Sequence, residues 1–175
     1  SKIYFVRHKK TKVDKNIFLG QKINPSIINN YMPLELKNLK IKRCISSPSL
    51  RCLQTGMLLF KERNIYINNY LKEIDYGRVE NLNYNDLKKK YPKIIKMWSK
   101  GKDPKFPGGE STKDVLIRLN KFLKFLITNS SKFKQNTLVI THNVFLRCLI
   151  GSHYNIPVKD WYNININIGI EYEVT

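Results

Sequence analysis

Short apolar runs of strand-forming residues alternate along this chain with longer segments of helical periodicity. The clearest run is TLVIT at residues 137–141, which is β-branched, apolar and short. Similar runs cover residues 3–7 and 42–46, and a weaker one covers 65–67. Because strands that alternate with helices form mostly parallel sheets, the pattern predicts an α/β fold.

The helical segments carry recognisable start and stop signals. In SPSLRCLQTGMLLFKE (residues 47–62), Ser47 is the expected N-cap and Pro48 the first helical residue, while Gly56 weakens the middle. The segment from Thr112 to Ile127 has an apolar stripe and begins with STKD, a loose capping box.

The last third of the chain predicts one more helix and a strand. NVFLRCLIG reads as a short apolar helix ending at Gly151, which leaves His153 in a surface loop. In NININIGIEYEV (163–174), apolar residues at every second position predict a half-buried strand near an edge of the sheet.

Size and composition limit the class of protein. A length of 175 residues suits one domain over residues 1–175, and a hydrophobic content of 42% excludes a disordered chain. No apolar run approaches the roughly 18 residues that span a bilayer, and no signal peptide is evident, so we expect no membrane partner and a cytoplasmic location. Three cysteines without CxxC spacing exclude a disulfide framework, and Cys44 and Cys148 are expected in the core.

The formal net charge of +19 has two interpretations. Such a field attracts polyanions, so nucleic acid or an anionic membrane is one candidate partner. However, the chain has 25 lysines, 7 arginines and no alanine, a bias typical of A/T-rich codons. We therefore favour compositional bias over a nucleic-acid partner.

Basic residues and histidines follow the predicted strands. Arg7 and His8 end the first strand, Arg51 lies one turn into the helix after the second, and His142 follows the strongest strand. Each alone is typical of a packed, capping or solvated side chain. In parallel sheets, however, ligands bind outside the carboxyl ends of the strands, where guanidinium groups and helix N-termini favour phosphate.

Five segments in order resemble a known family: FVRHKKT, SSPSLRCLQT, KEIDYG, FPGGES and THNVFLRCLI. They are similar to the histidine phosphatase superfamily, the phosphoglycerate-mutase-like proteins. The short length, and FLGQ near residue 20, favour its phosphatase branch, the group of α-ribazole-phosphate phosphatase. The resemblance implies a three-layer α/β/α sandwich.

The resemblance also implies the reaction. His8 would be the nucleophile that forms a phosphohistidine, its other ring nitrogen donating to a backbone carbonyl. His142 would be a second catalytic residue, and together with Arg7 and Arg51 it would hold the phosphoryl oxygens. We therefore expect a cofactor-independent phosphomonoesterase (a histidine acid phosphatase-like hydrolase) that needs no metal and acts on a small phosphorylated metabolite.

The proton donor and base is expected to be Glu73, with Asp75 as the nearest competitor. By the same resemblance, Thr11 and Asn143 join the phosphate-binding residues. Contacts to the leaving group fall mainly in loops around residues 12–34 and 80–110, which do not identify the substrate.

Several positions depart from the family pattern. Its usual glycine after Arg-His is Lys9, Lys10 follows, and an expected asparagine is Asp14. Its Trp-Glu-Gly reads Val79-Glu80-Asn81, and its Gly-Gly after the second histidine reads Asn143-Val144. Two alternatives therefore stay open: a phosphoglycerate mutase-type phosphoryl transfer, and a catalytically weak module that binds phosphate or polyanions. The oligomeric state, including a homodimer, is also open.

Overall fold

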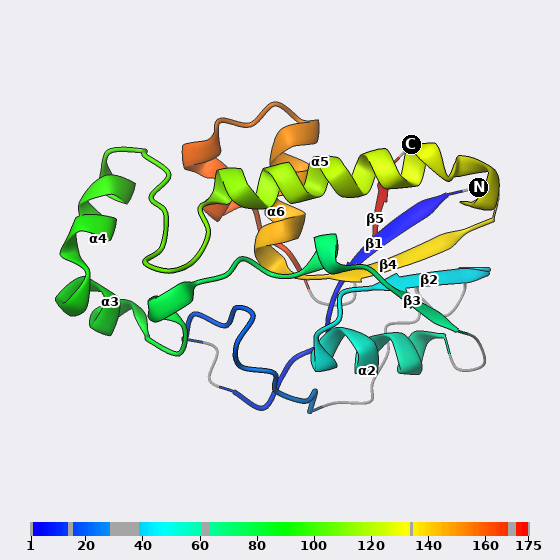
Figure 1. Cartoon of the computed structure of the whole chain (residues 1–175), viewed down its shortest axis with the longest axis horizontal. Coiled ribbons are helices and arrows are strands. Elements are labelled where there is room, and N and C mark those ends of the chain that lie inside the picture. Colours follow the sequence, from blue (N-terminus) through cyan, green and yellow to red (C-terminus); the bar gives the residue numbers. More distant parts are fainter. Residues whose placement is uncertain are drawn as a thin grey trace.

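A five-stranded sheet with the order β3-β2-β4-β1-β5 forms the centre of the described chain (Figure 1). The computed structural model describes residues 2–13, 16–28, 39–60, 64–133, 135–167 and 171–174. The strands are β1 (Ile3–Arg7), β2 (Arg43–Ser46), β3 (Ile65–Ile67), β4 (Thr137–Thr141) and β5 (Glu171–Val174). The first four are parallel and β5 is antiparallel to β1, which confirms the predicted mostly parallel sheet with an edge strand.

The register of the parallel strands brings their carboxyl ends to one level. Arg7 of β1 pairs with Thr141 of β4, and Ser46 of β2 pairs with Ile140. The backbone N–H of His8 donates to the Thr141 carbonyl at 3.0 Å. The residues that follow β1, β2 and β4 therefore share one edge of the sheet.

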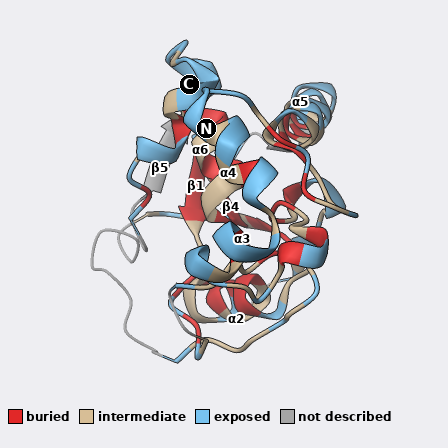
Figure 2. Ribbon diagram, turned by 90° about the vertical axis from the view of Figure 1, so that its left-hand side faces the viewer, coloured by how far each residue is buried: buried red, intermediate tan, exposed pale blue. Residues whose placement is uncertain are grey.

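Helices cover both faces of this sheet, giving the expected three-layer α/β/α sandwich (Figures 1 and 2). On one face, α5 (Thr112–Thr128) and α6 (Asn143–His153) pack on Phe5 and Val139. On the other face, α2 (Leu50–Leu59) packs on Tyr4 and Ile140. Neighbouring residues of each strand thus point into opposite core layers, because successive side chains of a strand alternate between the two faces of the sheet.

Shorter elements complete the described chain. Helices α3 (Tyr84–Lys90) and α4 (Pro92–Ser99) lie beyond one end of the sheet in Figure 1. The 3-10 helices are η1 (Asn69–Leu71), η2 (Gly77–Val79), η3 (Ser130–Phe133) and η4 (Val158–Asn163). Within the described residues, no helix combines the length and apolarity needed to span a bilayer.

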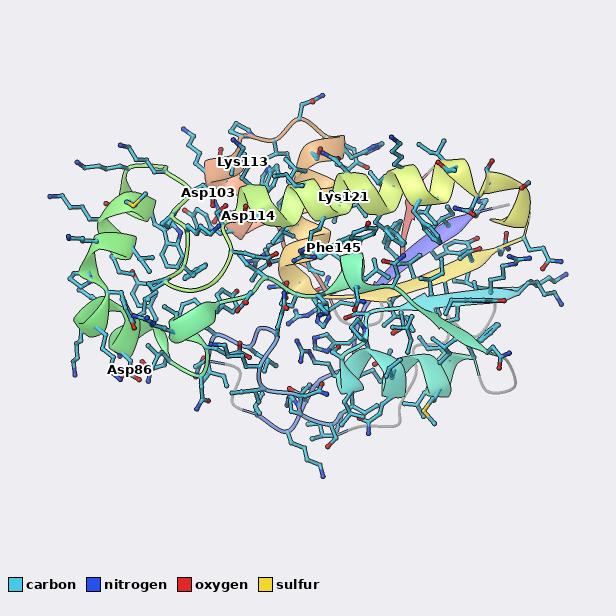
Figure 3. The ribbon with its side chains drawn as sticks, viewed as in Figure 1. Asp86, Asp103, Lys113, Asp114, Lys121 and Phe145 are labelled. Atoms are coloured by element: carbon cyan, nitrogen blue, oxygen red, sulfur yellow. The ribbon has the colours of Figure 1, made fainter. Side chains whose placement is uncertain are left out.

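The N-terminus of α5 is held by side chains, as the STKD segment predicts. Ser111 and Asp114 form a reciprocal capping box, and Asp103 accepts hydrogen bonds from the first two N–H groups of the helix. Asp103 and Asp114 lie together at this end of the helix in Figure 3. Both carboxylates therefore stabilise the positive end of the helix dipole.

The predicted start of α2 was wrong by two residues. Ser49, not Ser47, occupies the N-cap position, and the helix begins at Leu50. Gly56 has a packing role, because a β-carbon there would lie 2.9 Å from Ile65 and 3.2 Å from Ile140. The missing side chain lets α2 approach the sheet closely.

The predicted end of α6 was also wrong. The helix continues through Gly151 to His153, so the exposed His153 belongs to the helix and not to a loop. Gly151 is buried, and a β-carbon there would collide with the ring of Trp161. Close packing, rather than a helix end, explains this glycine.

The C-terminal strand is shorter than the alternating pattern suggests. Its register runs from Ile3–Val174 to Val6–Glu171, and β1 itself ends at Arg7. Ile164 caps η4, and Ile166 is buried in the core outside any strand; Ile168 and Ile170 lie outside the described residues. The cysteine prediction is confirmed, since Cys44 and Cys148 are free and buried.

Candidate active site

Two buried histidines face each other at the carboxyl edge of the sheet. His8 follows β1 and His142 follows β4, and their ring centroids lie 5.2 Å apart at an interplanar angle of 65°. Arg51, from the first turn of α2, reaches the same place and is 1% exposed. Parallel pairing of the strands thus joins residues that are far apart in the sequence.

His8 is held in one tautomer. Its Nδ1 lies 2.7 Å from the carbonyl oxygen of Lys9, and because a carbonyl can only accept, Nδ1 carries the proton. Nε2 is then unprotonated, and it accepts a hydrogen bond from Nε of Arg51 at 3.2 Å. Burial, and secondly the charge of Arg51, lower the pKa of His8 to about 3. His8 is therefore a neutral imidazole near pH 7.

Arg51 is anchored on its other side by backbone carbonyls. Its Nη2 donates to the carbonyl of Gly20 at 2.7 Å and its Nη1 to that of Ile23 at 3.3 Å. The guanidinium thus bridges the segment 20–23 and Nε2 of His8.

Glu80 organises the segment that anchors Arg51. A single carboxylate oxygen, Oε1, accepts hydrogen bonds from the backbone N–H groups of Gly20, Lys22 and Ile23, at 3.2, 2.8 and 2.8 Å. Gly20 is needed because a β-carbon there would lie 2.7 Å from the Ile74 carbonyl oxygen. The sequence reasoning missed this role, although Glu80 is the family residue kept between two replaced neighbours.

His142 is held by serine hydroxyls. Its Nε2 lies 2.8 Å from Oγ of Ser47 and 3.4 Å from Oγ of Ser49. Burial, followed by the charges of Arg51 and His8, keeps the pKa of His142 well below its usual value. The sequence pattern predicts Ser47 only as a helix cap. Its position directly after the end of a strand is the signal that could have identified it as a site residue.

Glu73 lies buried against the start of α6. Its Oε1 accepts from the N–H of Ile74 at 3.0 Å, and its Oε2 from that of Val144 at 3.2 Å. Burial raises the pKa of Glu73, although these bonds and the charges of Arg51 and Arg7 oppose the rise. Its competitor Asp75 is engaged elsewhere, because its carboxylate accepts the N–H of Gly77 in its own turn.

The remaining phosphate-binding candidates are Arg7, Asn143 and Thr11, and they differ in their contacts. Arg7 donates from Nη1 to the Ile166 carbonyl at 3.1 Å, and its charge lowers the pKa of His8. Asn143 begins α6, and its buried Oδ1 has no hydrogen-bond partner within the described residues. Thr11 is buried, but the described part of the chain shows no hydrogen bond from its side chain to either histidine.

One residue that departs from the family pattern, Lys9, directly follows His8. Lys9 is only 6% exposed, its N–H donates to Oγ1 of Thr55, and burial lowers its pKa. Asp14 lies outside the described residues. Among the described residues, no group of three His, Cys, Asp or Glu side chains could hold a metal ion.

Comparison with known proteins identifies the family. The model of the histidine phosphatase superfamily (branch 1) matches residues 32–170. The chain belongs to the histidine phosphatase superfamily. The matched range contains Arg51, Glu73 and His142, whereas Arg7 and His8 precede it.

Curated relatives of this chain include both phosphatases and mutases. Fructose-2,6-bisphosphatase of Saccharomyces cerevisiae is 32% identical over 59% of this chain, and 6-phosphofructo-2-kinase/fructose-2,6-bisphosphatase of Caenorhabditis elegans is 28% identical over 84% of it. The chain spans only 22% and 31% of the lengths of these two proteins.

Solved structures agree on the fold. The α-ribazole phosphatase from Shigella flexneri superimposes with a TM-score of 0.80 at 17% identity, covering 100% of this chain and 90% of that one. A mycobacterial glucosyl-3-phosphoglycerate phosphatase gives a TM-score of 0.76 at 16% identity, covering 94% and 84%. These similarities show the histidine phosphatase fold.

Proposed function

We propose that this chain hydrolyses a small-molecule phosphate monoester through a phosphohistidine on His8, without a cofactor. The observation that supports this most is the state of the His8 ring. Nδ1–H is donated to a carbonyl, the ring is neutral, and the unprotonated Nε2 faces the guanidinium of Arg51. A neutral nitrogen beside a fixed cation is suited to attack a phosphoryl group.

In the first step, the Nε–H of Arg51 turns from His8 Nε2 to a phosphoryl oxygen, and the freed lone pair of Nε2 forms a bond to phosphorus as the bond to the ester oxygen breaks. Nδ1 keeps its proton and continues to donate it in a hydrogen bond to the Lys9 carbonyl, and this bond stabilises the positive charge that the ring gains. Arg51, Arg7 and His142 would bind the phosphoryl oxygens, with Asn143 and Thr11 as further candidates. Phosphoryl transfer depends mainly on such positioning and charge stabilisation.

Glu73 would supply the proton that the leaving alkoxide needs. Its burial raises its pKa, so the carboxyl group holds a proton at a higher pH than an exposed glutamate would. In the second step, the Glu73 carboxylate would accept a proton from water as the water attacks phosphorus. The bond from Nε2 to phosphorus then breaks, and inorganic phosphate leaves.

Hydrolysis of p-nitrophenyl phosphate by the wild type and by His8→Ala tests the proposal. We expect turnover in the wild type and none above background in His8→Ala. His153→Ala is the matched control, because His153 is exposed at the end of α6, and it should keep wild-type activity. Equal inactivity of all three proteins on a broad panel of phosphate esters would instead favour a weak phosphate-binding module.

Phosphoryl transfer by a mutase is the second candidate function, and one relative supports it. A 2,3-bisphosphoglycerate-dependent phosphoglycerate mutase of Azorhizobium caulinodans is 26% identical over 85% of this chain and 79% of its own length. Both reactions would use His8 in the same way and differ in the acceptor. Following the phosphoryl group separates them: hydrolysis releases inorganic phosphate, whereas a mutase returns the group to an organic phosphate.

A further inference from the structure

A cavity of about 520 Å³ adjoins the proposed acid. Ile74 and Val144 line it, and their backbone N–H groups hold the two oxygens of Glu73. The cavity therefore begins one residue away from the group that would protonate the leaving alkoxide. Its volume lies in the ordinary range of small-molecule sites, about 300–1,000 Å³.

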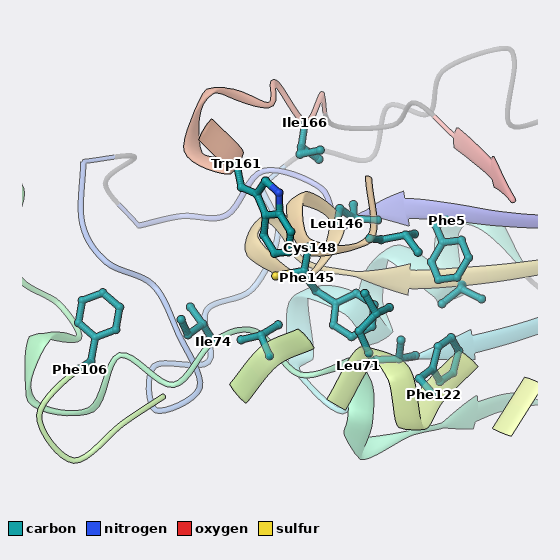
Figure 4. Close-up of a cluster of buried hydrophobic side chains, with 14 of the residues drawn as sticks. Phe5, Leu71, Ile74, Phe106, Phe122, Phe145, Leu146, Cys148, Trp161 and Ile166 are labelled. Atoms are coloured by element: carbon teal, nitrogen blue, oxygen red, sulfur yellow. The ribbon is translucent and has the colours of Figure 1, made fainter. Parts of the chain in front are cut away.

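Aromatic side chains from several segments line this cavity. Tyr76 and Phe106 have ring centroids 4.9 Å apart, and Trp98 and Phe106 have theirs 5.7 Å apart. Trp161 contributes a further wall, with its Nε1–H already donated to the Ile156 carbonyl. Figure 4 shows Phe106, Ile74 and Trp161, which come from three separate segments. Such walls favour an apolar guest that contains a ring.

The charged side chains that line the cavity are mostly cationic. Arg147 lies one turn after Val144 on α6, half-buried, and its Nε donates to the Ile164 carbonyl at 3.0 Å. Among the described residues, no hydrogen bond involves its two Nη nitrogens. Lys102 and Lys159 lie exposed at the rim, whereas both oxygens of Asp103 are already bound by the N-terminus of α5. An anionic group on the guest would offset this positive charge.

We propose that this cavity receives the leaving group of the substrate, and that this group is a bulky ring-containing alcohol with a second anionic group bound by Arg147. This inference rests on the proposed phosphatase function, since it names the class of ester that would be hydrolysed. Compact aliphatic phosphates would leave the aromatic walls in contact with water, and a neutral ring would leave Arg147 uncompensated.

Matched substrate pairs test both halves of the inference. Phenyl and 2-naphthyl phosphate have similar leaving groups but differ by one ring, and we expect about tenfold higher kcat/KM for naphthyl, the scale of burying that extra ring. 6-Carboxy-2-naphthyl phosphate should exceed its carboxamide analogue by about tenfold, as expected for a charge-assisted hydrogen bond.

Variants assign these preferences to the cavity. Arg147→Met should remove most of the preference for carboxylate over carboxamide, whereas Arg78→Met, at an exposed arginine outside the cavity, should keep it. Trp98→Leu should reduce the preference for naphthyl over phenyl. Phe125→Leu, an aromatic-to-leucine change outside the cavity, should not.

A binding measurement makes the test independent of catalysis. The chain has two tryptophans, Trp98 and Trp161, and both line the cavity, so their fluorescence reports its occupancy. Adamantane-1-carboxylate, which is transparent at these wavelengths, should change the emission at lower concentration than adamantane-1-carboxamide, and Arg147→Met should remove the difference.

The outcomes separate the two proposals. If His8-dependent hydrolysis is present but the paired substrates react equally, the leaving-group inference is overturned and the phosphatase proposal stands. If no ester is hydrolysed but the carboxylate binds preferentially through Arg147, the proposed function fails and the ligand class of the cavity is supported. Equal or absent binding of the two adamantanes would overturn the assignment of Arg147.

Discussion

Replacing Arg51 with lysine tests the centre of the proposed site while keeping a positive charge in place. The guanidinium donates to His8 Nε2, to the Gly20 carbonyl and to the Ile23 carbonyl, at 3.2, 2.7 and 3.3 Å. A lysine ammonium lacks the planar fork that makes these bonds together. The substitution therefore separates the geometry of the cation from its charge.

The expected losses follow from these bonds. Removing a group that stabilises charge in the transition state costs about 2.7–4 kcal/mol, so kcat/KM should fall by about 10²–10³-fold. Hydrogen bonds to charged groups contribute about 1.5–3 kcal/mol each. Because lysine can retain one of the two carbonyl bonds, the free energy of unfolding should fall by about 1.5–3 kcal/mol.

Steady-state hydrolysis and urea unfolding would measure the two effects. Arg51→Ala should lose at least as much activity as Arg51→Lys, and Arg78→Lys, at an exposed position, should lose neither activity nor stability. If kcat/KM of Arg51→Lys stays within about threefold of the wild-type value, the guanidinium fork does not stabilise the transition state, and the proposed role of Arg51 is wrong.

Two further predictions concern stability and positioning. Lowering the pH from 7 to 5 should destabilise the fold, because the unfolded chain protonates His8 and His142 while the folded chain keeps His8 neutral and holds the pKa of His142 well below its usual value. The cost approaches about 2 kcal/mol for His8, and His142 adds to it in the same direction. Glu73 partly offsets the loss, because its raised pKa lets the folded chain take up a proton first. Urea unfolding should show a smaller acid loss in His8→Ala, and an unchanged loss would contradict the assignment. Glu80→Ala should lower kcat by about tenfold or more, because Arg51 would lose the segment that positions it. Glu80→Gln should retain more activity. If both variants have the same kcat as the wild type, Glu80 has no positioning role.

Periodicity and strand ends were enough to predict the frame of the site. TLVIT is buried throughout as β4, and the fold class follows from its alternation with helices. Because parallel strands end at one edge, His8, Arg51 and His142 could be expected together before any distance was known. Their meeting needs only the register of β1, β2 and β4.

Other features of the site and the fold have no pattern in the sequence from which they could be predicted. Glu80 binds N–H groups about 60 residues earlier in the chain, and such a contact has no periodic signature. Ser47 and Ser49 are equally good caps by composition, and only the structure shows that Ser49 is the N-cap and Ser47 the nearer partner of His142. The alternation of Ile164 and Ile166 suits a strand, but β1 is too short to pair with them.

The most direct test of the proposed reaction is to trap the phosphorylated histidine. In Glu73→Gln, loss of the general base should slow attack by water, so that p-nitrophenyl phosphate leaves one phosphoryl group on the chain. Intact-mass measurement followed by peptide mapping should locate it on His8 as an acid-labile phosphohistidine, with no label in Glu73→Gln/His8→Ala. Label on another residue, or hydrolysis by the wild type with no detectable phosphohistidine in rapid-quench samples, would contradict nucleophilic attack by His8.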